Sequence, residues 1–164
     1  MDITVRHAEP ADAAALRRLF EARSVVTGTL QLPFPRSSLW QGRLQHAPEG
    51  LYQLVACAEG EVVGSLTLQT SPTRPRIRHV GSIGMAVRDD WQGKGVGTEL
   101  MRAVLDLAEN WPNLTRVELE VYADNAAGIV LYEKLGFERE GTHLRYAFRD
   151  GEYVDAYSMA RVKD

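Results

Sequence analysis

The sequence has little cysteine, no long apolar run and no strong excess of charge of either sign. Cys57 is the single cysteine, so no disulfide can form within the chain and nothing indicates an oxidising compartment. No apolar run approaches the ~18 residues that cross a bilayer, and the opening residues lack the basic and apolar stretches of a secretory signal. A formal net charge of −3 gives no general attraction to nucleic acid or anionic membranes. These absences predict a cytoplasmic protein that binds neither nucleic acid nor membrane.

The chain has the length and apolar content of one folded unit. Of its 164 residues, 45% are hydrophobic and 25% are charged, which is ordinary for a globular protein. A domain of this size buries roughly two thirds of its unfolded surface, so it needs neither a disulfide nor a structural metal. We expect residues 1–164 to form a single domain with no metal site.

Hydrophobic periodicity predicts helices and strands in a mixed order. Strands are predicted at 3–6, 52–58, 61–70, 79–87, 115–122, 145–148 and 153–162. Helices are predicted at 11–22, 38–46, 97–110 and 125–135, and an unusually apolar loop at 25–36. The order β-α-α-β-β-β-α-β-α-β-β is neither strictly alternating nor separated into halves. It therefore favours an α/β fold in which a mixed sheet carries helices on both faces.

One face of the predicted strand at 79–87 is almost bare of side chains. Large apolar side chains alternate along this strand with small ones. The large set is Ile83, Met85 and Val87, and the small set is Ser82, Gly84 and Ala86. The small face would let another molecule approach the backbone.

A glycine-rich segment lies between this strand and the predicted helix at 97–110. It reads Gln92-Gly93-Lys94-Gly95-Val96-Gly97-Thr98. Three glycines at alternate positions let the backbone turn tightly and expose consecutive N–H groups, and the start of the helix adds unpaired donors and a partial positive charge. Together with the Lys94 ammonium, these groups form an anion cradle suited to a pyrophosphate.

Two well-known phosphate-binding loops do not fit this segment. A nucleoside-triphosphate loop needs Gly-x-x-x-x-Gly-Lys-Ser/Thr, but Arg88 stands where the first glycine is required. A dinucleotide loop needs Gly-x-Gly-x-x-Gly, but Thr98 or Leu100 stands at the last glycine position. A third pattern, Arg/Gln-x-x-Gly-x-Gly/Ala, is fulfilled from Gln92 onward.

A second motif follows downstream, where Asn125 begins a predicted helix, Tyr132 comes seven residues later and Leu135-Gly136-Phe137 ends it. The two motifs together resemble the GNAT superfamily of acetyltransferases, and the likeness extends over nearly the whole chain. The segments 29–33 and 151–162 look like those of the bacterial YhhY-type L-amino acid N-acetyltransferases. The resemblance implies the GNAT fold, a mainly antiparallel sheet of about seven strands with two helices on each face.

The resemblance also implies roles for particular residues. The segment 92–98 would hold the pyrophosphate of acetyl-coenzyme A, and Asn125 would hydrogen-bond its pantetheine arm while also capping its helix. Tyr132 would protonate the departing thiolate, which suits a phenol that is protonated at neutral pH. The backbone N–H groups of Met85, Ala86 and Val87 would hold the oxyanion, where the strands of the family splay apart.

The general base is left open. Many relatives carry a Glu or His at positions that correspond to 81–83, but here these are Gly, Ser and Ile. Glu120 is the best replacement, because Leu119-Glu120-Val121 resembles the ribosomal-protein N-terminal acetyltransferases, in which this Glu is the base. Glu120 could instead form an ion pair with Arg116. His79, through its near-neutral pKa, and a relay of waters are the other candidates.

An amino-acid acceptor needs a cation for its carboxylate. The segment Arg74-Pro75-Arg76-Ile77-Arg78 is the expected supply, with Arg76 at its centre, because arginine binds carboxylates in a bidentate manner. These arginines could also contact the 3′-phosphate of coenzyme A or lie in solvent. Gln31 and Phe34 of the apolar loop would close the acceptor pocket.

These observations predict an acetyl-coenzyme A-dependent N-acetyltransferase that acts on a small primary amine, with a free amino acid as the favoured acceptor. The amine would attack the bound thioester directly, without a metal. Acetylation of a protein N-terminus or lysine is the alternative among enzymes, and a catalytically silent acyl-coenzyme A sensor is the alternative outside them. The tyrosine-rich last hairpin is a candidate surface for a homodimer.

Overall fold

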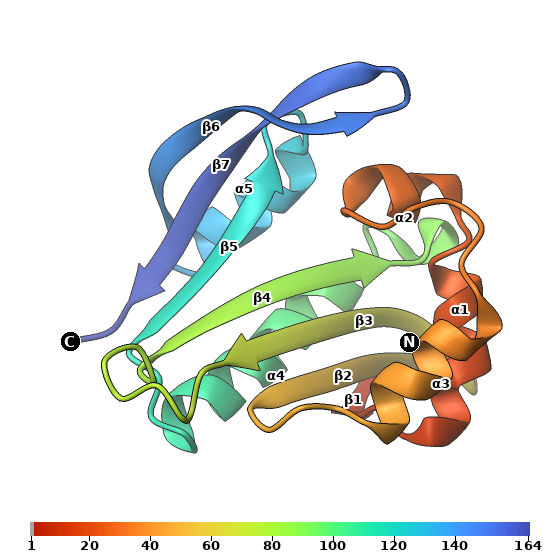
Figure 1. The fold of residues 1–164 in the computed structure, drawn as a ribbon, viewed down its shortest axis with the longest axis horizontal. Coiled ribbons are helices and arrows are strands. Elements are labelled where there is room, and N and C mark those ends of the chain that lie inside the picture. Colours follow the sequence, from red (N-terminus) through yellow and green to blue (C-terminus); the bar gives the residue numbers. More distant parts are fainter. Residues whose placement is uncertain (1) are drawn as a thin grey trace.

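A seven-stranded sheet in the order β1-β2-β3-β4-β5-β7-β6 runs through the computed structural model, which describes residues 2–164 (Figure 1). All neighbouring strands are antiparallel except β4 and β5, which are parallel. The strands are β1 Thr4–His7, β2 Leu51–Ala58, β3 Glu61–Thr70, β4 Val80–Val87, β5 Arg116–Tyr122, β6 Glu138–Arg149 and β7 Glu152–Val162. The predicted mixed, mainly antiparallel sheet is confirmed.

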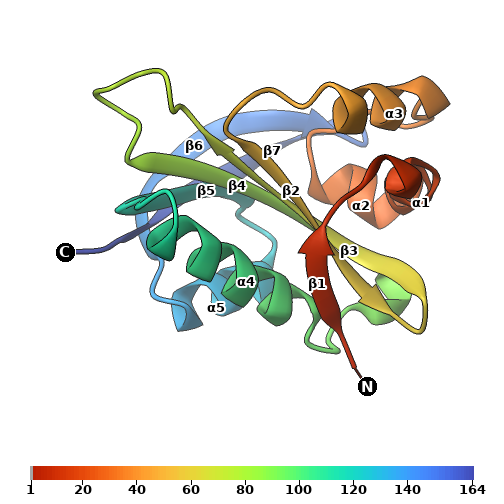
Figure 2. The same cartoon turned by 90° about the horizontal axis from the view of Figure 1, so that it is seen from below.

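Five helices cover the two faces of the sheet (Figure 2). One face carries α1 Ala13–Leu19, α2 Arg23–Gly28 and α3 Ser37–Gln45, and the other carries α4 Val96–Asn110 and α5 Ala126–Lys134. Helix α2 lies at the start of the segment predicted as a loop, and it makes a third helix on its face. It forms because Val25, which is buried, packs with α1 and α3. No helix within residues 2–164 is long and apolar enough to cross a membrane.

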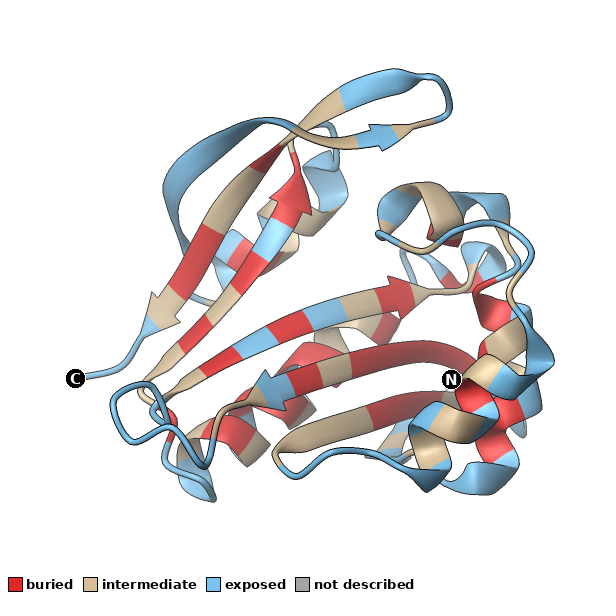
Figure 3. Cartoon of the chain, viewed as in Figure 1, coloured by how far each residue is buried: buried red, intermediate tan, exposed pale blue. Residues whose placement is uncertain are grey.

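The core is divided between the two faces of the sheet. Under α4, the apolar side chains that recur at helical spacing pack on the sheet and are fully buried, among them Leu100, Met101 and Val104. Under α1 and α3, a second cluster includes Phe20 and Trp40, whose rings stack with their centroids 4.8 Å apart. Figure 3 shows the buried residues along the central strands and the inner sides of these helices.

Strand β6 is longer than predicted. It extends over Glu138–Arg149, whereas the sequence predicted a strand at 145–148 only. Its first seven residues are all exposed, so they carry no alternation that could reveal a strand. Pairing with β7 holds them in place, and the register shifts twice along the pair.

The pairing between β4 and β5 is short, and this feature positions the site. The two strands pair from Val80↔Arg116 to Ser82↔Glu118. Beyond this point β4 continues beside β3 as far as Val87, and β5 continues beside β7 as far as Tyr122. The two strands therefore diverge, and Figure 1 shows the wedge between them.

Candidate active site

The wedge exposes backbone groups of β4. Successive residues of a strand direct their backbone hydrogen bonds to opposite sides. The N–H of Arg88 donates to the carbonyl of Val63 on the β3 side (2.9 Å), and the carbonyl of His79 accepts from the N–H of Arg116 on the β5 side (3.2 Å). Even-numbered residues of β4 therefore face β3, and odd-numbered residues face β5.

This alternation divides the predicted oxyanion donors. The amides of Met85 and Val87 point into the wedge beyond the last paired residues, Ser82 and Glu118, and have no partner strand there within residues 2–164. Ala86 lies opposite Ser65 and directs its amide to β3. Met85 and Val87 thus keep the geometry that an oxyanion donor requires, and Ala86 contributes only its small side chain to the wall of the site.

The glycine-rich segment turns from the end of β4 into α4. Gly93 and Gly95 have φ values of 71° and 88°, where other residues are strained. A Cβ at either position would meet nothing within 4 Å. At Gly97, by contrast, a Cβ would lie 3.2 Å from Cδ2 of Leu131 and 3.3 Å from Cε of Met85. Two of the glycines are therefore needed for the turn, and the third lets α4 approach α5 and β4 closely.

The first amides of α4 are open at this turn. The first backbone bond within the helix runs from the N–H of Glu99 to the carbonyl of Gly95 (3.0 Å), so the preceding amides, those of 96–98, remain free to bind an anion. The Lys94 ammonium lies 5.0 Å from the centroid of the buried Trp91 ring. Gln92 donates from Nε2 to the carbonyl of Val87 (3.4 Å), which ties the segment to β4. This arrangement fits a pyrophosphate.

Asn125 caps α5 beside the wedge. Its Oδ1 accepts from the N–H of Gly128 (3.0 Å), and a Cβ at Gly128 would lie only 2.6 Å from its Nδ2. Nδ2 itself has no hydrogen-bond partner among residues 2–164, and Asn125 lines the cavity described below. The cap therefore leaves two donors free for another molecule.

Tyr132 lies on the same helix and is 9% exposed. Its ring centroid is 5.9 Å from that of Phe137. Burial raises the pKa of the phenol to about 12, since a charged phenolate would be poorly solvated there. The hydroxyl is therefore protonated throughout the physiological range, as a proton donor to a thiolate must be.

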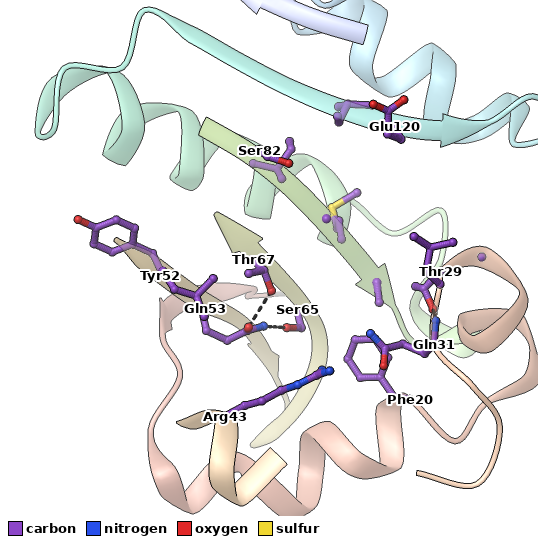
Figure 4. Close-up of a pocket in the computed structure, with 18 of the residues that line it drawn as sticks. Phe20, Thr29, Gln31, Arg43, Tyr52, Gln53, Ser65, Thr67, Ser82 and Glu120 are labelled. Carbon is purple, nitrogen blue, oxygen red and sulfur yellow. Dashed lines mark hydrogen bonds between the residues drawn. The ribbon is translucent and has the colours of Figure 1, made fainter. Parts of the chain in front are cut away.

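A cavity of about 640 Å³ joins these groups to the helices on the other face of the sheet (Figure 4). Its walls come from the loop after α2, from α3, and from the facing parts of β2, β3, β4 and β5. Gly84 and Ala86 line it, as expected for the bare face of β4, and so do Glu120 and Tyr132. The wedge amides and the Tyr132 phenol therefore open into one space that can hold a second substrate.

Glu120 has a partner that the sequence did not reveal. Its Oε2 lies 3.2 Å from Nε2 of His143 on β6. Desolvation raises the pKa of the Glu120 carboxyl, while His143 opposes this rise. Arg116, the predicted partner, instead pairs with Glu118 (2.9 Å) and Glu140. Glu120 is thus free of arginine and can accept a proton.

Of the residues predicted to bind the acceptor or, in the case of His79, also to act as a base, one lies within the cavity and three lie outside it. Gln31 lines the cavity. Phe34 is 94% exposed and does not reach the cavity, because the loop turns outward with φ of 61° at this residue. Arg76 and His79 both lie in the β3–β4 loop, at the closed end of the wedge (Figure 1). The His79 carbonyl accepts from the N–H of Arg116 of β5 there (3.2 Å), and His79 is not among the residues that line the cavity.

The sequence did not single out Arg43 of α3, which lines the side of the cavity away from Glu120 (Figure 4). Tyr122 and Tyr146 line the side near Glu120, and the Tyr122 hydroxyl donates to the carbonyl of Thr29 (2.7 Å). Within residues 2–164 no group of three or more His, Cys, Asp or Glu side chains is placed to hold a metal ion.

Comparisons with known proteins agree with this geometry. The model of the acetyltransferase (GNAT) family matches residues 15–137. The L-amino acid N-acetyltransferase AaaT of Escherichia coli is 48% identical over 162 residues, which are 99% of each chain. An N-alpha-acetyltransferase of Saccharolobus solfataricus is 33% identical over 141 residues, 80% of this chain and 81% of the relative. A GNAT acetyltransferase from Streptococcus pneumoniae has the same fold, with a TM-score of 0.85 and 27% identity over 98% of this chain and 99% of its own.

The family model covers most of the chain, from residue 15 to residue 137. The chain belongs to the GNAT family of acetyltransferases.

Proposed function

We propose that the chain is one N-acetyltransferase domain, which moves the acetyl group of acetyl-coenzyme A to the primary amine of a free L-amino acid. The observation that carries this proposal is the cavity, which brings together Met85 of the wedge, the Tyr132 phenol and space for a second substrate. The near full-length relative AaaT is named for the same acceptor class.

The acetyl-coenzyme A would lie across the wedge. Its pyrophosphate would bind the open amides at the start of α4, and the free Nδ2 of Asn125 would donate to the pantetheine arm. The thioester carbonyl would then reach the wedge amides of Met85 and Val87. Donors fixed in this way stabilise the developing oxyanion without having to reorganise.

The chemistry needs two proton transfers. The neutral amine forms a bond to the carbonyl carbon, and the resulting tetrahedral intermediate breaks its carbon–sulfur bond. Tyr132 gives its phenolic proton to the departing thiolate, and the proton lost by the amine passes to Glu120. Because His143 lies 3.2 Å from the Glu120 carboxylate, it can carry this proton on to solvent.

A thiol-release assay tests the proposal. Acetyl-coenzyme A is offered with amino acids, polyamines, aminoglycosides and peptides, using the wild type, Tyr132→Phe and the matched control Tyr153→Phe. We expect turnover with amino acids, a loss of about 10²- to 10⁴-fold in kcat for Tyr132→Phe, and no change for the control, whose exposed ring lies in β7.

Two other functions make different predictions in the same assay. Acetylation of protein N-termini would show turnover with peptides only, and the Saccharolobus solfataricus relative is named for that activity. A silent sensor would bind coenzyme A and release no thiol. The bounded cavity favours a small acceptor, and the buried, protonated Tyr132 favours catalysis.

We further propose that the enzyme acts in the cytoplasm as a homodimer formed through the β6–β7 hairpin. The lone cysteine, which leaves the fold independent of disulfides, supports the compartment. Large apolar side chains exposed along the hairpin, Leu144, Phe148 and Tyr153, support the dimer. Light scattering at micromolar concentration would give the oligomeric state.

A further inference from the structure

One positively charged and one negatively charged side chain of residues 2–164 line the cavity. Arg43 is the only lysine or arginine among the lining residues within 2–164, and Glu120 is the only aspartate or glutamate. They lie on opposite sides of the sheet's wedge, Arg43 on α3 and Glu120 on β5 (Figure 4). A carboxylate would therefore be attracted to the α3 side of the cavity, away from Glu120.

Arg43 is held beside an aromatic ring and not by a carboxylate of the described residues. Its guanidinium carbon lies 5.0 Å from the centroid of the Trp40 ring, which is itself buried and lines the cavity. Within residues 2–164 no carboxylate lies within 4.0 Å of the guanidinium, and no hydrogen bond engages it. Figure 4 shows the side chain extending from α3 along the cavity toward Phe20. The donors of Arg43 therefore remain available to a ligand.

The polar groups nearest to this side of the cavity satisfy one another. Thr67 donates from its hydroxyl to Oε1 of Gln53 (2.7 Å), and Gln53 donates from Nε2 to the hydroxyl of Ser65. These neutral groups form a fixed floor on β2 and β3 and supply no charge. Phe20 and Trp40 also line this side, and the buried indole N–H of Trp40 has no hydrogen-bond partner within residues 2–164. Arg43 supplies the full positive charge that an anionic group would meet here.

We propose that Arg43 binds the α-carboxylate of the acceptor and so selects amino acids over simple amines. The guanidinium would meet the carboxylate with two parallel hydrogen bonds, and the amine would then be directed across the bare face of β4 toward the wedge amides. The proposal rests on the proposed function. It moves the carboxylate site from the 74–78 segment, which lies outside the cavity, to α3.

The expected size of the effect follows from the exposure of the site. Charge-assisted hydrogen bonds to a carboxylate are among the strong ones, but Arg43 is on the exposed side of the cavity, where water weakens them. Removing either partner should therefore lower kcat/KM by about 10- to 100-fold.

The test varies enzyme and substrate together. Thiol release is measured for L-leucine, L-phenylalanine and L-glutamine, each beside its α-carboxamide and its decarboxylated amine, with the wild type, Arg43→Gln, Arg43→Lys and Arg76→Gln. The wild type and Arg76→Gln should prefer the amino acids by about 10- to 100-fold. Arg43→Gln should lose this preference while keeping its turnover of the carboxamides, and Arg43→Lys should restore part of it.

Several results would overturn the proposal. If Arg43→Gln weakened amino acids and carboxamides equally, the residue would have a structural role only. If Arg76→Gln lost the preference, the carboxylate site would be in the β3–β4 loop. If the wild type acetylated amino acids without preferring them to carboxamides, this site would be refuted while the function stood. If no amine were acetylated, the function and the site would both fall.

Discussion

Replacing Gly95 with alanine isolates the conformational demand of the pyrophosphate cradle. Gly95 is the N-cap of α4 with φ of 88°, and a Cβ there would meet nothing within 4 Å. The substitution therefore adds no clash. Gly42 is the matched control, since a Cβ there would also meet nothing, but it lies inside α3 with no positive φ.

The two substitutions should have opposite signs. A left-handed backbone disfavours alanine by about 1–2 kcal/mol, so Gly95→Ala should lower the free energy of unfolding by about that amount. Gly42→Ala should raise it by about 0.5–1 kcal/mol, because alanine restricts the unfolded chain and favours the helix. For a chain of this size 1 kcal/mol shifts Tm by about 2–4 °C. Gly95→Ala should thus lower Tm by about 2–8 °C, and Gly42→Ala should raise it by about 1–4 °C.

Thermal unfolding with and without saturating coenzyme A measures both effects. Strain at Gly95 should also move the first amides of α4 and so weaken the binding of coenzyme A. Each tenfold loss of affinity removes about 1.4 kcal/mol of the stabilisation that the bound ligand gives. Gly95→Asn should lie between glycine and alanine, because asparagine tolerates this conformation better. Equal shifts for Gly95→Ala and Gly42→Ala would refute the reasoning.

Two further predictions concern acidic groups. Glu120→Gln should lower kcat/KM by about 10²- to 10⁴-fold, and it should remove from the pH profile a rising limb whose pKa lies above the ordinary glutamate value. The control Glu118→Gln, on the same strand, should have little effect. Unchanged activity of Glu120→Gln would assign the role of the base to water. Asp12→Asn should destabilise the fold by about 1–3 kcal/mol at pH 7, because Arg6 holds the Asp12 carboxylate through two bonds of 2.8 and 2.9 Å and lowers its pKa. This stabilisation is present above the pKa of aspartate in the unfolded chain, near 4, and is lost as the pH falls through the lower pKa of Asp12 in the folded protein. The urea midpoints of variant and wild type should therefore converge in acid. A difference that stayed constant with pH would contradict the assignment of this stabilisation to the Arg6–Asp12 ion pair.

Sequence patterns within a short stretch of the chain predicted the elements whose formation depends on neighbouring residues alone. The long amphipathic α4 follows from the spacing of its apolar residues, and the cradle follows from three glycines at alternate positions. Helix α2 was missed because Val25, Val26 and Thr27 are β-branched and Gly28 follows them, which together disfavour a helix. Its formation depends on burial of Val25 against other helices, and no local window contains that information.

The site residues that escaped prediction belong to elements that are far apart in the sequence. His143 of β6 lies near Glu120 of β5 because these two strands pair with opposite edges of β7. His143 lies opposite Ala156 of β7, and Glu120 lies opposite Ser158. The arginine of α3 joins the cavity by the packing of that helix on the sheet. A cluster of arginines in a loop looked like a better carboxylate site, since the sequence does not reveal at which end of β4 the wedge opens.

The divergence of β4 and β5 also affects how the sheet presents its edges. An exposed strand edge can pair with a strand of another chain, and proteins protect such edges in several ways. Here the open edges of β4 and β5 face each other within one sheet, and residues of α3 also line the cavity between them. These edges lie in the middle of the sheet and not at its border, where a strand of another chain would add. The fold thus keeps unpaired amides in the middle of a sheet, ready for a ligand, without offering them as a template for aggregation.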